Sequence, residues 1–217
     1  MKIGVFDSGI GGLSVAQAIE KALPEAQVIF VHDTPDHFPY ATKSPEQIYG
    51  FVLPIFQDLI TQDCDAIVVA CNTVSTNLIK QLREDFRNVP LVAMEPMVKP
   101  AAEQTKSGII AICATPTTLS SHRYQWLKDT YAKGITVLEP DCSDWSYLIE
   151  HNQMNDQKIR ERIEPVIAQG ADVIVLGCTH YHWIEDEIKG IAQSRAIVLQ
   201  PEIPVIFQLK RVLNLAK

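Results

Sequence analysis

The 217-residue sequence lacks the features that would place it in several large classes of protein. No cluster of lysine and arginine offsets its formal net charge of −7, which argues against a general nucleic-acid binder. No apolar run approaches the roughly 20 residues that cross a bilayer. The N-terminal MKIGVFDSG also lacks the charged, apolar and small-residue sections of a signal peptide. We therefore expect a cytoplasmic protein that binds neither nucleic acid nor membrane.

The cysteines are few and scattered. Five occur, an odd number with no CxxC spacing, so in a reducing compartment they predict no disulfide. Zinc ligands would be clustered at short spacing, so the pattern also predicts no metal site. Cys64 and Cys113 fit the ordinary role of small buried hydrophobes. Cys71 and Cys178 differ, because each ends an apolar run and is followed by polar residues, in ACNTVS and in GCTHYH.

What the chain does have is a regular alternation of short apolar runs and helical segments. Segments such as STNLIKQLREDF and DQKIRERIEPVIAQ show helical periodicity. Strands that alternate with helices predict an α/β fold with parallel sheets. The apolar runs expected to form the strands begin near Lys2, Gln27, Asp65, Pro90, Ile109, Gly134, Asp172 and Ile197.

The second half of this pattern repeats the first at a nearly constant offset of 107 residues. We therefore predict two similar parallel-sheet α/β domains related by a pseudo-twofold axis. Such sheets bind ligands at the carboxyl ends of their strands, so the loops of both domains would meet at an active site in one cleft. The offset places Cys71 on Cys178, Asp65 on Asp172, Tyr40 on Tyr147, and Ser8 on Thr115.

The predicted domain boundaries follow from the same pattern. The first domain is expected to cover residues 1–95 and 203–217 and to carry Asp7 and Cys71. The second is expected to cover residues 96–202 and to carry Cys178 and His180. The final segment, IPVIFQLKRVLNLAK, has the pattern of an amphipathic helix that returns to the first domain. No low-complexity linker separates the two, so we expect them to pack closely.

The motif FDSGIGGLSV follows the first predicted strand and opens a helix. Gly9, Gly11 and Gly12 permit a tight turn, and backbone N–H groups at a helix start suit an anion. A nucleotide phosphate loop is disfavoured, because the motif lacks GKS or GKT and does not fit GxGxxG. A ligand carboxylate near Asp7 and a purely structural glycine turn both stay open.

The motif HFPYATKS lies in a predicted loop with two turn-forming clusters. Tyr40, Thr42, Lys43 and Ser44 offer donors at the level of the strand ends, which suits a small polar ligand. A solvated loop is an equal alternative, because Lys43 and Ser44 followed by Pro and Glu also fit the start of the next helix.

Cys71 and Cys178 each stand at a predicted strand end and helix start, where the helix dipole favours a thiolate. Asp7 is expected near Cys71, and His180 near Cys178, as groups that accept a proton or a hydrogen bond. A Cys–His nucleophile is the rival chemistry, but it leaves one cysteine without a role. Two thiols across a cleft suit a reaction that needs a base and an acid on opposite faces, such as inversion at a carbon. The side chains suited to a carboxylate or ammonium group are Asn72, Thr73 and Thr179.

The motifs FDSGIGGLSV, PYATKS, ACNTVS, EPMVKPA, ATPTTLSSHRY and LGCTHY extend over nearly the whole chain. In this order they resemble the motifs of the cofactor-independent glutamate racemases of the aspartate/glutamate racemase superfamily. The resemblance implies two α/β domains with one active site between them, and racemisation of glutamate without pyridoxal phosphate, metal or nucleotide. It also implies supply of D-glutamate for bacterial peptidoglycan, and a homodimer, since family members are often dimers.

The resemblance further implies roles for individual residues. Cys71 would deprotonate D-glutamate and Cys178 would deprotonate L-glutamate, with Asp7 and His180 assisting the thiols. DCSDWSYLIE aligns loosely with a family segment that ends in an assisting glutamate, which gives Glu150 that role; a solvated helix position is the alternative. The residues implied in substrate binding are Ser8, Pro39, Tyr40, Ala41, Asn72, Thr73, Thr115 and Thr179.

Four departures from the family's motifs bear on the site. The usual PYG is PYA, with Ala41 in place of glycine, and GCTHYP is GCTHYHW, with His182 and Trp183 at a helix start. Residues 141–147 lack the prolines and apolar residues of their counterpart, and QPEIP at 200–204 replaces a DSA-like loop. These changes leave two alternatives open. One is a racemase or isomerase of aspartate or another small acid, and the other is a non-catalytic protein that binds an amino acid or a protein partner.

Overall fold

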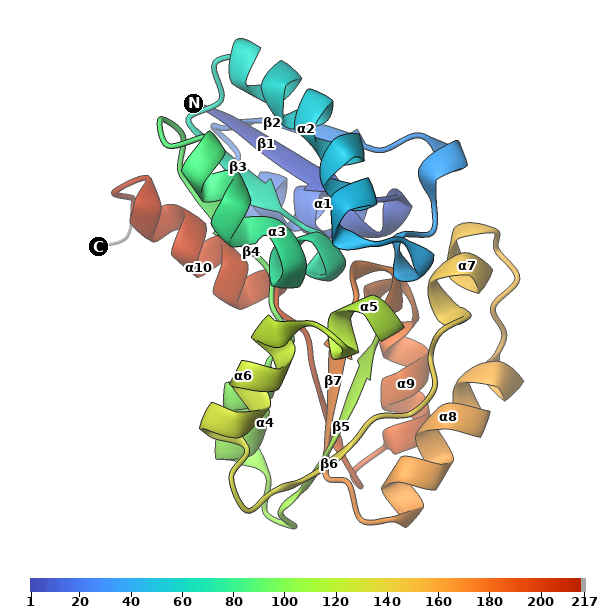
Figure 1. Ribbon diagram of the computed structural model, residues 1–217. Helices are drawn as coiled ribbons and strands as arrows, with labels where there is room; N and C mark the ends of the chain where they lie inside the picture. Colours follow the sequence, from blue (N-terminus) through green and yellow to red (C-terminus); the bar gives the residue numbers. More distant parts are fainter. Residues whose placement is uncertain (216–217) are drawn as a thin grey trace.

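The computed structural model describes residues 1–215, which form two stacked α/β units (Figure 1). Residues 216–217, the end of the predicted first domain, lie outside the described part of the chain. The first unit holds strands β1 to β4 with helices α1, α2, α3 and α10, and the second unit holds β5 to β8 with α4 to α9. The fold class predicted from the sequence is confirmed.

Each unit is built on one four-stranded, fully parallel sheet. The strand order is β2-β1-β3-β4 in the first sheet and β6-β5-β7-β8 in the second. In Figure 1 the arrows of β5 and β7 point toward the first unit, so the carboxyl edge of the second sheet faces it. The strands are β1 Lys2–Asp7, β2 Gln27–His32, β3 Ala66–Val69, β4 Leu91–Ala93, β5 Ile109–Ala114, β6 Thr136–Leu138, β7 Val173–Gly177 and β8 Ile197–Leu199.

The two sheets share their register under the offset found in the sequence. Ile3 pairs with Ala66 in the first sheet and Ile110 pairs with Val173 in the second, a shift of 107 residues for both partners. Strand β6 begins two residues later than expected, because Gly134 lies in a left-handed turn with φ of 77°. The predicted repeat is therefore a repeat of sheet geometry as well as of sequence spacing.

Helices cover both faces of each sheet. No helix within residues 1–215 combines the length and the apolar character needed to cross a membrane. The α-helices are α1 Leu13–Ala22, α2 Pro45–Thr61, α3 Asn72–Asp85, α4 Val98–Gln104, α5 Pro116–Leu119, α6 His122–Tyr131, α7 Trp145–Glu150, α8 Asp156–Ala168, α9 Glu185–Ala192 and α10 Glu202–Val212. Four short 3₁₀-helices are described as well, namely η1 Ile10–Gly12, η2 Pro35–His37, η3 Tyr40–Thr42 and η4 Thr179–Ile184.

Each sheet separates two apolar cores, because successive strand residues point to opposite faces. In the first sheet Ile67 and Val69 pack with α2 and α3, whereas Ala66 and Val68 pack with α1 and α10. In the second sheet one face packs with α8 and α9, and the other with α4 and α6. Each unit is thus a three-layer sandwich whose strand ends are left for the site.

The C-terminal helix α10 packs on the first unit although it follows the second in the chain. Val205 and Leu209 are buried in the same cluster as Ile3 and Val5. The chain therefore crosses between the units twice, after β4 and after β8. The domain boundaries near residues 95 and 203 stay a prediction, which this packing supports.

Candidate active site

The two cysteines that the sequence singled out lie at the carboxyl edges of the two sheets. Cys71 follows β3 and directly precedes α3, and Cys178 follows β7 and directly precedes η4. Their exposed fractions are 4% and 7%, and both line one cavity between the units. Each sulfur stands at a helix start, where nearby backbone N–H groups offset part of the cost of burying a thiolate.

The cavity between the thiols has a volume of only about 10 Å³. Pro39, Asp7 and Glu150 do not line it. Asp7 contacts Thr179 and Glu150 contacts His180, and both of these partners do line it. Phe38 and Ser146 line the cavity but were not predicted; the only signal was their place inside the motifs HFPYATKS and DCSDWSYLIE. The other predicted residues that line it are Ser8, Tyr40, Ala41, Asn72, Thr73, Thr115, Thr179 and His180.

The surroundings of Cys71 favour its protonated form. Burial is the largest influence and raises the pKa of the Cys71 thiol, and the nearby charge of Asp7 raises it further. The sulfur lies 3.5 Å from Ser8 Oγ, a contact that opposes the rise without cancelling it. In this closed arrangement Cys71 is therefore suited to act as an acid.

Cys178 instead lies beside a basic group. His180 Nδ1 is 3.9 Å from its sulfur, and His180 Nε2 is 2.6 Å from Glu150 Oε2. Burial lowers the pKa of His180, but its hydrogen bonds to Cys178 and Glu150 outweigh burial and raise that pKa to about 10. Because a protonated imidazole stabilises a neighbouring thiolate, Cys178 is suited to act as a base.

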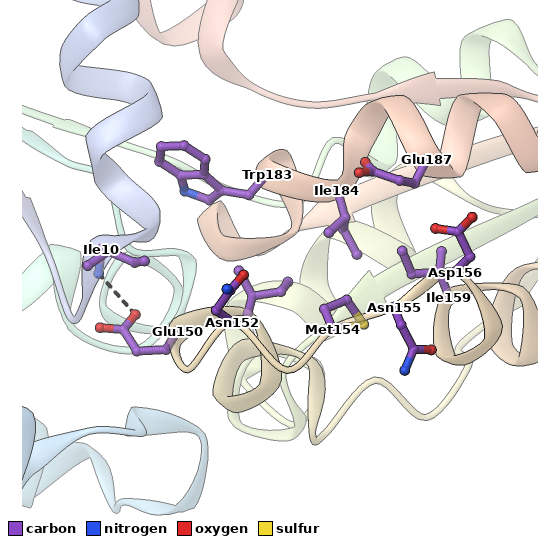
Figure 2. A pocket seen from close by; sticks show the side chains of 11 residues that line it. Ile10, Glu150, Asn152, Met154, Asn155, Asp156, Ile159, Trp183, Ile184 and Glu187 are labelled. Carbon is purple, nitrogen blue, oxygen red and sulfur yellow. Dashed lines mark hydrogen bonds between the residues drawn. The ribbon is translucent and has the colours of Figure 1, made fainter.

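Glu150 links the two units at the side of Cys178. Its Oε2 accepts a hydrogen bond of 3.1 Å from the backbone N–H of Ile10 (Figure 2). The same oxygen also contacts His180 Nε2. Burial opposes ionisation of Glu150, yet His180 and the Ile10 N–H hold its pKa below the ordinary value. A half-buried carboxylate with two partners is not simply a solvated helix residue.

A second, larger cavity of about 390 Å³ lies on the outer side of Glu150 (Figure 2). Met154, Ile159 and Trp183 supply apolar surface to it. Asp156 and Glu187 supply two carboxylates besides that of Glu150. Glu150 therefore contacts the wall of the thiol cavity through His180 and also lines this outer cavity.

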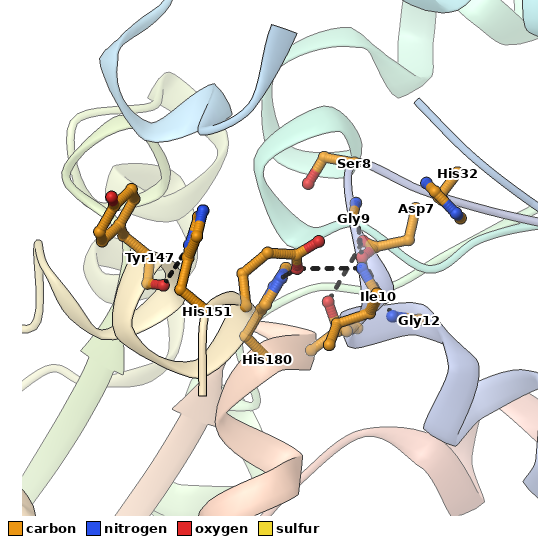
Figure 3. A network of polar contacts seen from close by, with 12 residues as sticks. Asp7, Ser8, Gly9, Ile10, Gly12, His32, Tyr147, His151 and His180 are labelled. Carbon is orange, nitrogen blue, oxygen red and sulfur yellow. Dashed lines mark hydrogen bonds and ion pairs between the residues drawn. The ribbon is translucent and has the colours of Figure 1, made fainter. Parts of the chain in front are cut away.

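Asp7 is fully buried at the end of β1 and holds the glycine loop (Figure 3). Its Oδ2 accepts hydrogen bonds from the backbone N–H groups of Gly9 at 3.2 Å and Gly12 at 3.0 Å. Its Oδ1 accepts one of 3.2 Å from Thr179 Oγ1 in the second unit. Burial raises the pKa of Asp7, while the charge of His180 and the backbone donors oppose the rise.

Tyr40 is fixed by a buried carboxylate. Its hydroxyl donates to Asp33 Oδ2 at 2.5 Å, and the same oxygen lies 2.8 Å from His37 Nδ1. Burial and the bond to Asp33 raise the pKa of the Tyr40 hydroxyl, which therefore stays protonated. Ser44, further along the motif, forms a capping box with Gln47 at the start of α2. For Ser44, the structure therefore favours a role in starting the helix over a role in binding a ligand.

Asn72 shows a clear need for a polar ligand. It is 2% exposed and lines the cavity, yet within the described residues its side-chain nitrogen and oxygen have no hydrogen-bond partner. Burying a polar group without a partner costs about 1–3 kcal/mol. A ligand that carries both an acceptor and a donor, such as a carboxylate and an ammonium group, would satisfy both atoms.

Gly11 lies where the two units approach each other closely. A Cβ added to Gly11 would lie 2.6 Å from the backbone nitrogen of His180 and 2.8 Å from Thr179 Oγ1. Because one of these is a backbone atom, a side chain here would have to push η4 away from the glycine loop. Gly11 is therefore required by this close approach.

The internal symmetry does not extend to every side chain. Tyr147, the counterpart of Tyr40, is 45% exposed and stacks on His151 at a ring distance of 4.1 Å (Figure 3). Thr115, the counterpart of Ser8, does line the cavity and lies 3.0 Å from Thr73 Oγ1. The site is thus symmetric in its thiols and asymmetric in much of what surrounds them.

The arrangement of the thiols defines the chemistry that the site can perform. A base from one unit can take a proton from one face of a carbon, and an acid from the other unit can return a proton to the opposite face. Within residues 1–215, no group of three or more His, Cys, Asp or Glu side chains is arranged to hold a metal ion. A two-unit α/β fold with opposed thiols is that of a racemase, an isomerase.

The chain belongs to the Asp/Glu/hydantoin racemase family, whose family model matches residues 3–206. It is 36% identical to the glutamate racemase of Ectopseudomonas mendocina over 216 residues, which cover 98% of this chain and 82% of that protein. It is 38% identical to the glutamate racemase of Pseudomonas aeruginosa, with 98% and 81% covered. The resemblance found in the motifs is confirmed.

Solved structures agree with this assignment. Escherichia coli glutamate racemase in complex with L-glutamate and the activator UDP-MurNAc-ala has a TM-score of 0.84 and 27% identity, with 98% of this chain and 82% of that chain covered. Francisella tularensis glutamate racemase in complex with D-glutamate has a TM-score of 0.81 and 27% identity, with 100% and 83% covered.

Proposed function

We propose that the protein is a glutamate racemase that interconverts L- and D-glutamate by proton transfer between Cys71 and Cys178. The observation that carries the proposal is one cavity lined by two buried thiols, one from each unit, beside the unpartnered amide of Asn72. The relatives described above are glutamate racemases, and two of the solved ones were crystallised with L- or D-glutamate.

The proposed reaction from L-glutamate begins at Cys178. Its thiolate removes the α-proton, so the Cα–H bond breaks and an S–H bond forms. The Cys71 thiol then gives its proton to the opposite face of the carbanion, which yields D-glutamate, a Cys71 thiolate and a Cys178 thiol. The reaction from D-glutamate uses the same steps in reverse, with Cys71 as the base. Each turnover exchanges the protonation states of the two thiols, so no cofactor and no net proton are required.

The surrounding residues make this difficult proton transfer feasible. The α-proton of an amino acid is weakly acidic, so the charge that develops on the substrate needs aimed hydrogen-bond donors. Asn72 offers an amide for the substrate, and the protonated His180, supported by Glu150, stabilises the Cys178 thiolate. The charge of Asp7 raises the pKa of the Cys71 thiol and so favours its role as the acid in this direction. The residues proposed to complete substrate binding are Ser8, Tyr40, Ala41, Thr73, Thr115 and Thr179.

Substrate must enter by separation of the two units. A cavity of about 10 Å³ holds roughly one water molecule, far less than glutamate. The contacts of Thr179 with Asp7 and of Glu150 with the Ile10 backbone cross the cleft and would open and reform with each binding event. A cleft that closes over its substrate excludes water and so protects the carbanion from random protonation.

The biological role follows from the product. A bacterial enzyme of this kind supplies D-glutamate for peptidoglycan, and we propose that role and a cytoplasmic location here. A homodimer stays a prediction from the resemblance.

Proton NMR in D₂O tests the proposal with L-glutamate and D-glutamate in separate samples, followed by chiral analysis. The wild-type protein should exchange the α-proton for deuterium and invert each enantiomer. Cys71→Ser and Cys178→Ser should each lose inversion, because a serine hydroxyl is far less acidic than a thiol. Cys64→Ser is the matched control, since Cys64 is buried to a similar degree but does not line the cavity.

The outcomes separate the alternatives. Full racemisation by either cysteine variant would defeat the two-thiol assignment. No exchange with glutamate by the wild-type protein would turn attention to aspartate and other small acids, and failure of that panel would favour a non-catalytic binding protein.

A further inference from the structure

His182 joins the second unit to two helices of the first. Its Nδ1 lies 3.1 Å from Glu202 Oε1 at the start of α10, and 3.4 Å from Ser14 Oγ in α1. The side chains of His182 and Glu202 are 2% and 18% exposed. Because the nearest neighbour of Nδ1 is a carboxylate oxygen, Nδ1 carries a hydrogen and donates it to Glu202.

Glu202 is itself held in position. Its backbone N–H donates to Gln200 Oε1 at 2.7 Å, and Gln200 Nε2 donates to Glu202 Oε2 at 3.2 Å. Burial opposes ionisation, yet His182 holds the pKa of Glu202 below its ordinary value. A charged acceptor is therefore fixed at the first turn of α10, where the helix dipole also favours it.

The two partners fall in two of the places where this sequence departs from the motifs it resembles. His182 stands where GCTHYP has proline, and Glu202 lies in QPEIP, which replaces the DSA-like loop. A proline side chain has no hydrogen-bond donor. The two residues that differ from the motifs are thus hydrogen-bonded to each other, although they lie 20 positions apart in the sequence.

The contact lies in the segment that carries part of the site. Helix η4 holds Thr179 and His180, which line the thiol cavity, and His182 is in the same short helix. Thr179 ties the start of η4 to Asp7, and His182 ties its middle to α1 and α10. Movement of η4 away from the first unit must therefore break the contacts at both points.

We propose that His182 is a positioning residue: through Glu202 it seats η4 against the first unit and so holds Cys178 opposite Cys71 in the closed cleft. Its kinetic effect rests on the proposed racemase function, whereas its effect on closure of the cleft does not. Loss of the hydrogen bond lowers kcat, because the thiols spend less time aligned for proton transfer, and changes KM less.

A matched pair of variants isolates this hydrogen bond. Both His182→Asn and His182→Gln remove the ring and introduce a carboxamide. The asparagine amide nitrogen occupies the position of histidine Nδ1, whereas the longer glutamine places its nitrogen at the position of Nε2. Only His182→Asn therefore preserves the donor to Glu202. The two readouts are kcat for glutamate and the rates at which iodoacetamide alkylates Cys71 and Cys178, resolved by mass spectrometry with Cys64 as the internal reference.

His182→Gln should lower kcat and speed alkylation of both site thiols by about tenfold each, the size of one hydrogen bond to a charged group. His182→Asn should stay within about threefold of wild type in both readouts. Glu202→Gln, which removes only the charge, should shift both readouts in the same direction as His182→Gln. The double variant should differ little from His182→Gln alone. This third variant keeps the test intact if His182→Gln fails to fold.

Three results would overturn the proposal. They are wild-type behaviour of both His182→Gln and Glu202→Gln, equal losses in the asparagine and glutamine variants, and equal acceleration at Cys64, which would indicate general destabilisation. If the wild-type protein does not racemise glutamate but His182→Gln exposes only the two site thiols, the positioning role stands and the proposed substrate fails.

Discussion

Replacing Glu150 by glutamine should move the alkaline limit of racemisation to lower pH. Glu150→Gln keeps the size of the side chain but removes the carboxylate that lies 2.6 Å from His180 Nε2. The protonated His180 stabilises the Cys178 thiolate, so activity is lost as pH rises through the pKa of His180, about 10 in the wild-type protein. Without its partner that pKa falls, and the loss begins at lower pH.

The size of the effect follows from the contact itself. A hydrogen bond to a charged group contributes about 1.5–3 kcal/mol, and about 1.36 kcal/mol corresponds to one pKa unit. The alkaline limb should therefore move down by roughly one to two pH units. Because the Glu150 side chain is 20% exposed, solvent screens part of its charge and favours the smaller change.

Racemisation offers an internal check on this measurement. L- and D-glutamate are enantiomers of equal free energy, so kcat/KM must be the same in both directions for every variant. Glu150→Gln should lower kcat/KM equally for the two enantiomers at alkaline pH, although kcat and KM taken separately can differ. Unequal values of kcat/KM would reveal a fault in the assay.

The assay is circular dichroism of glutamate racemisation, with kcat/KM measured as a function of pH. Glu187→Gln is the matched control, because Glu187 lines the same outer cavity as Glu150 but is exposed and makes no contact with His180 among the described residues. If the alkaline limb of Glu150→Gln coincided with those of the wild type and the control, the assigned role of Glu150 would be wrong.

Two further substitutions test the packing of the site and of the fold. Gly11→Ala should lower kcat/KM by about 100-fold, because the added Cβ displaces η4; Gly190→Ala, where a Cβ meets nothing within 4 Å, should leave activity unchanged. Wild-type activity of Gly11→Ala would contradict the close approach. Leu209→Ala, in α10, should lower the free energy of unfolding by about 2–5 kcal/mol in urea denaturation, since Leu209 is 0% exposed. A change below about 1 kcal/mol would show that α10 contributes little to the core.

The positions of the two thiols could be predicted because they depend on local sequence. An apolar run that ends in polar residues marks the end of a buried strand and the start of a helix. Cys71 and Cys178 both occupy that place. The spacing of the runs also indicated the repeated sheet, and the order of the motifs indicated the family; the structure and the relatives confirm both.

The contacts that cross the cleft could not be predicted, because they depend on how closely and at what angle two separately folded units meet. Tyr40 and Tyr147 are equivalent in spacing, yet only Tyr40 lines the cavity. Ser146 reaches the cavity from a segment that matches the family motifs poorly. His182 and Glu202 were each visible as departures, but nothing in the one-dimensional pattern showed that they touch.

The return of α10 to the first unit has a consequence for synthesis on the ribosome. The second unit has both of its apolar cores within residues 97–199, so the chain that can complete them emerges before α10 does. The core begun by Ile3 and Val5 must wait for Val205 and Leu209, nearly the whole chain later. The part of the protein that is made first is thus finished last. Until then the nascent chain carries an incompletely covered apolar sheet face, the kind of surface that chaperones bind.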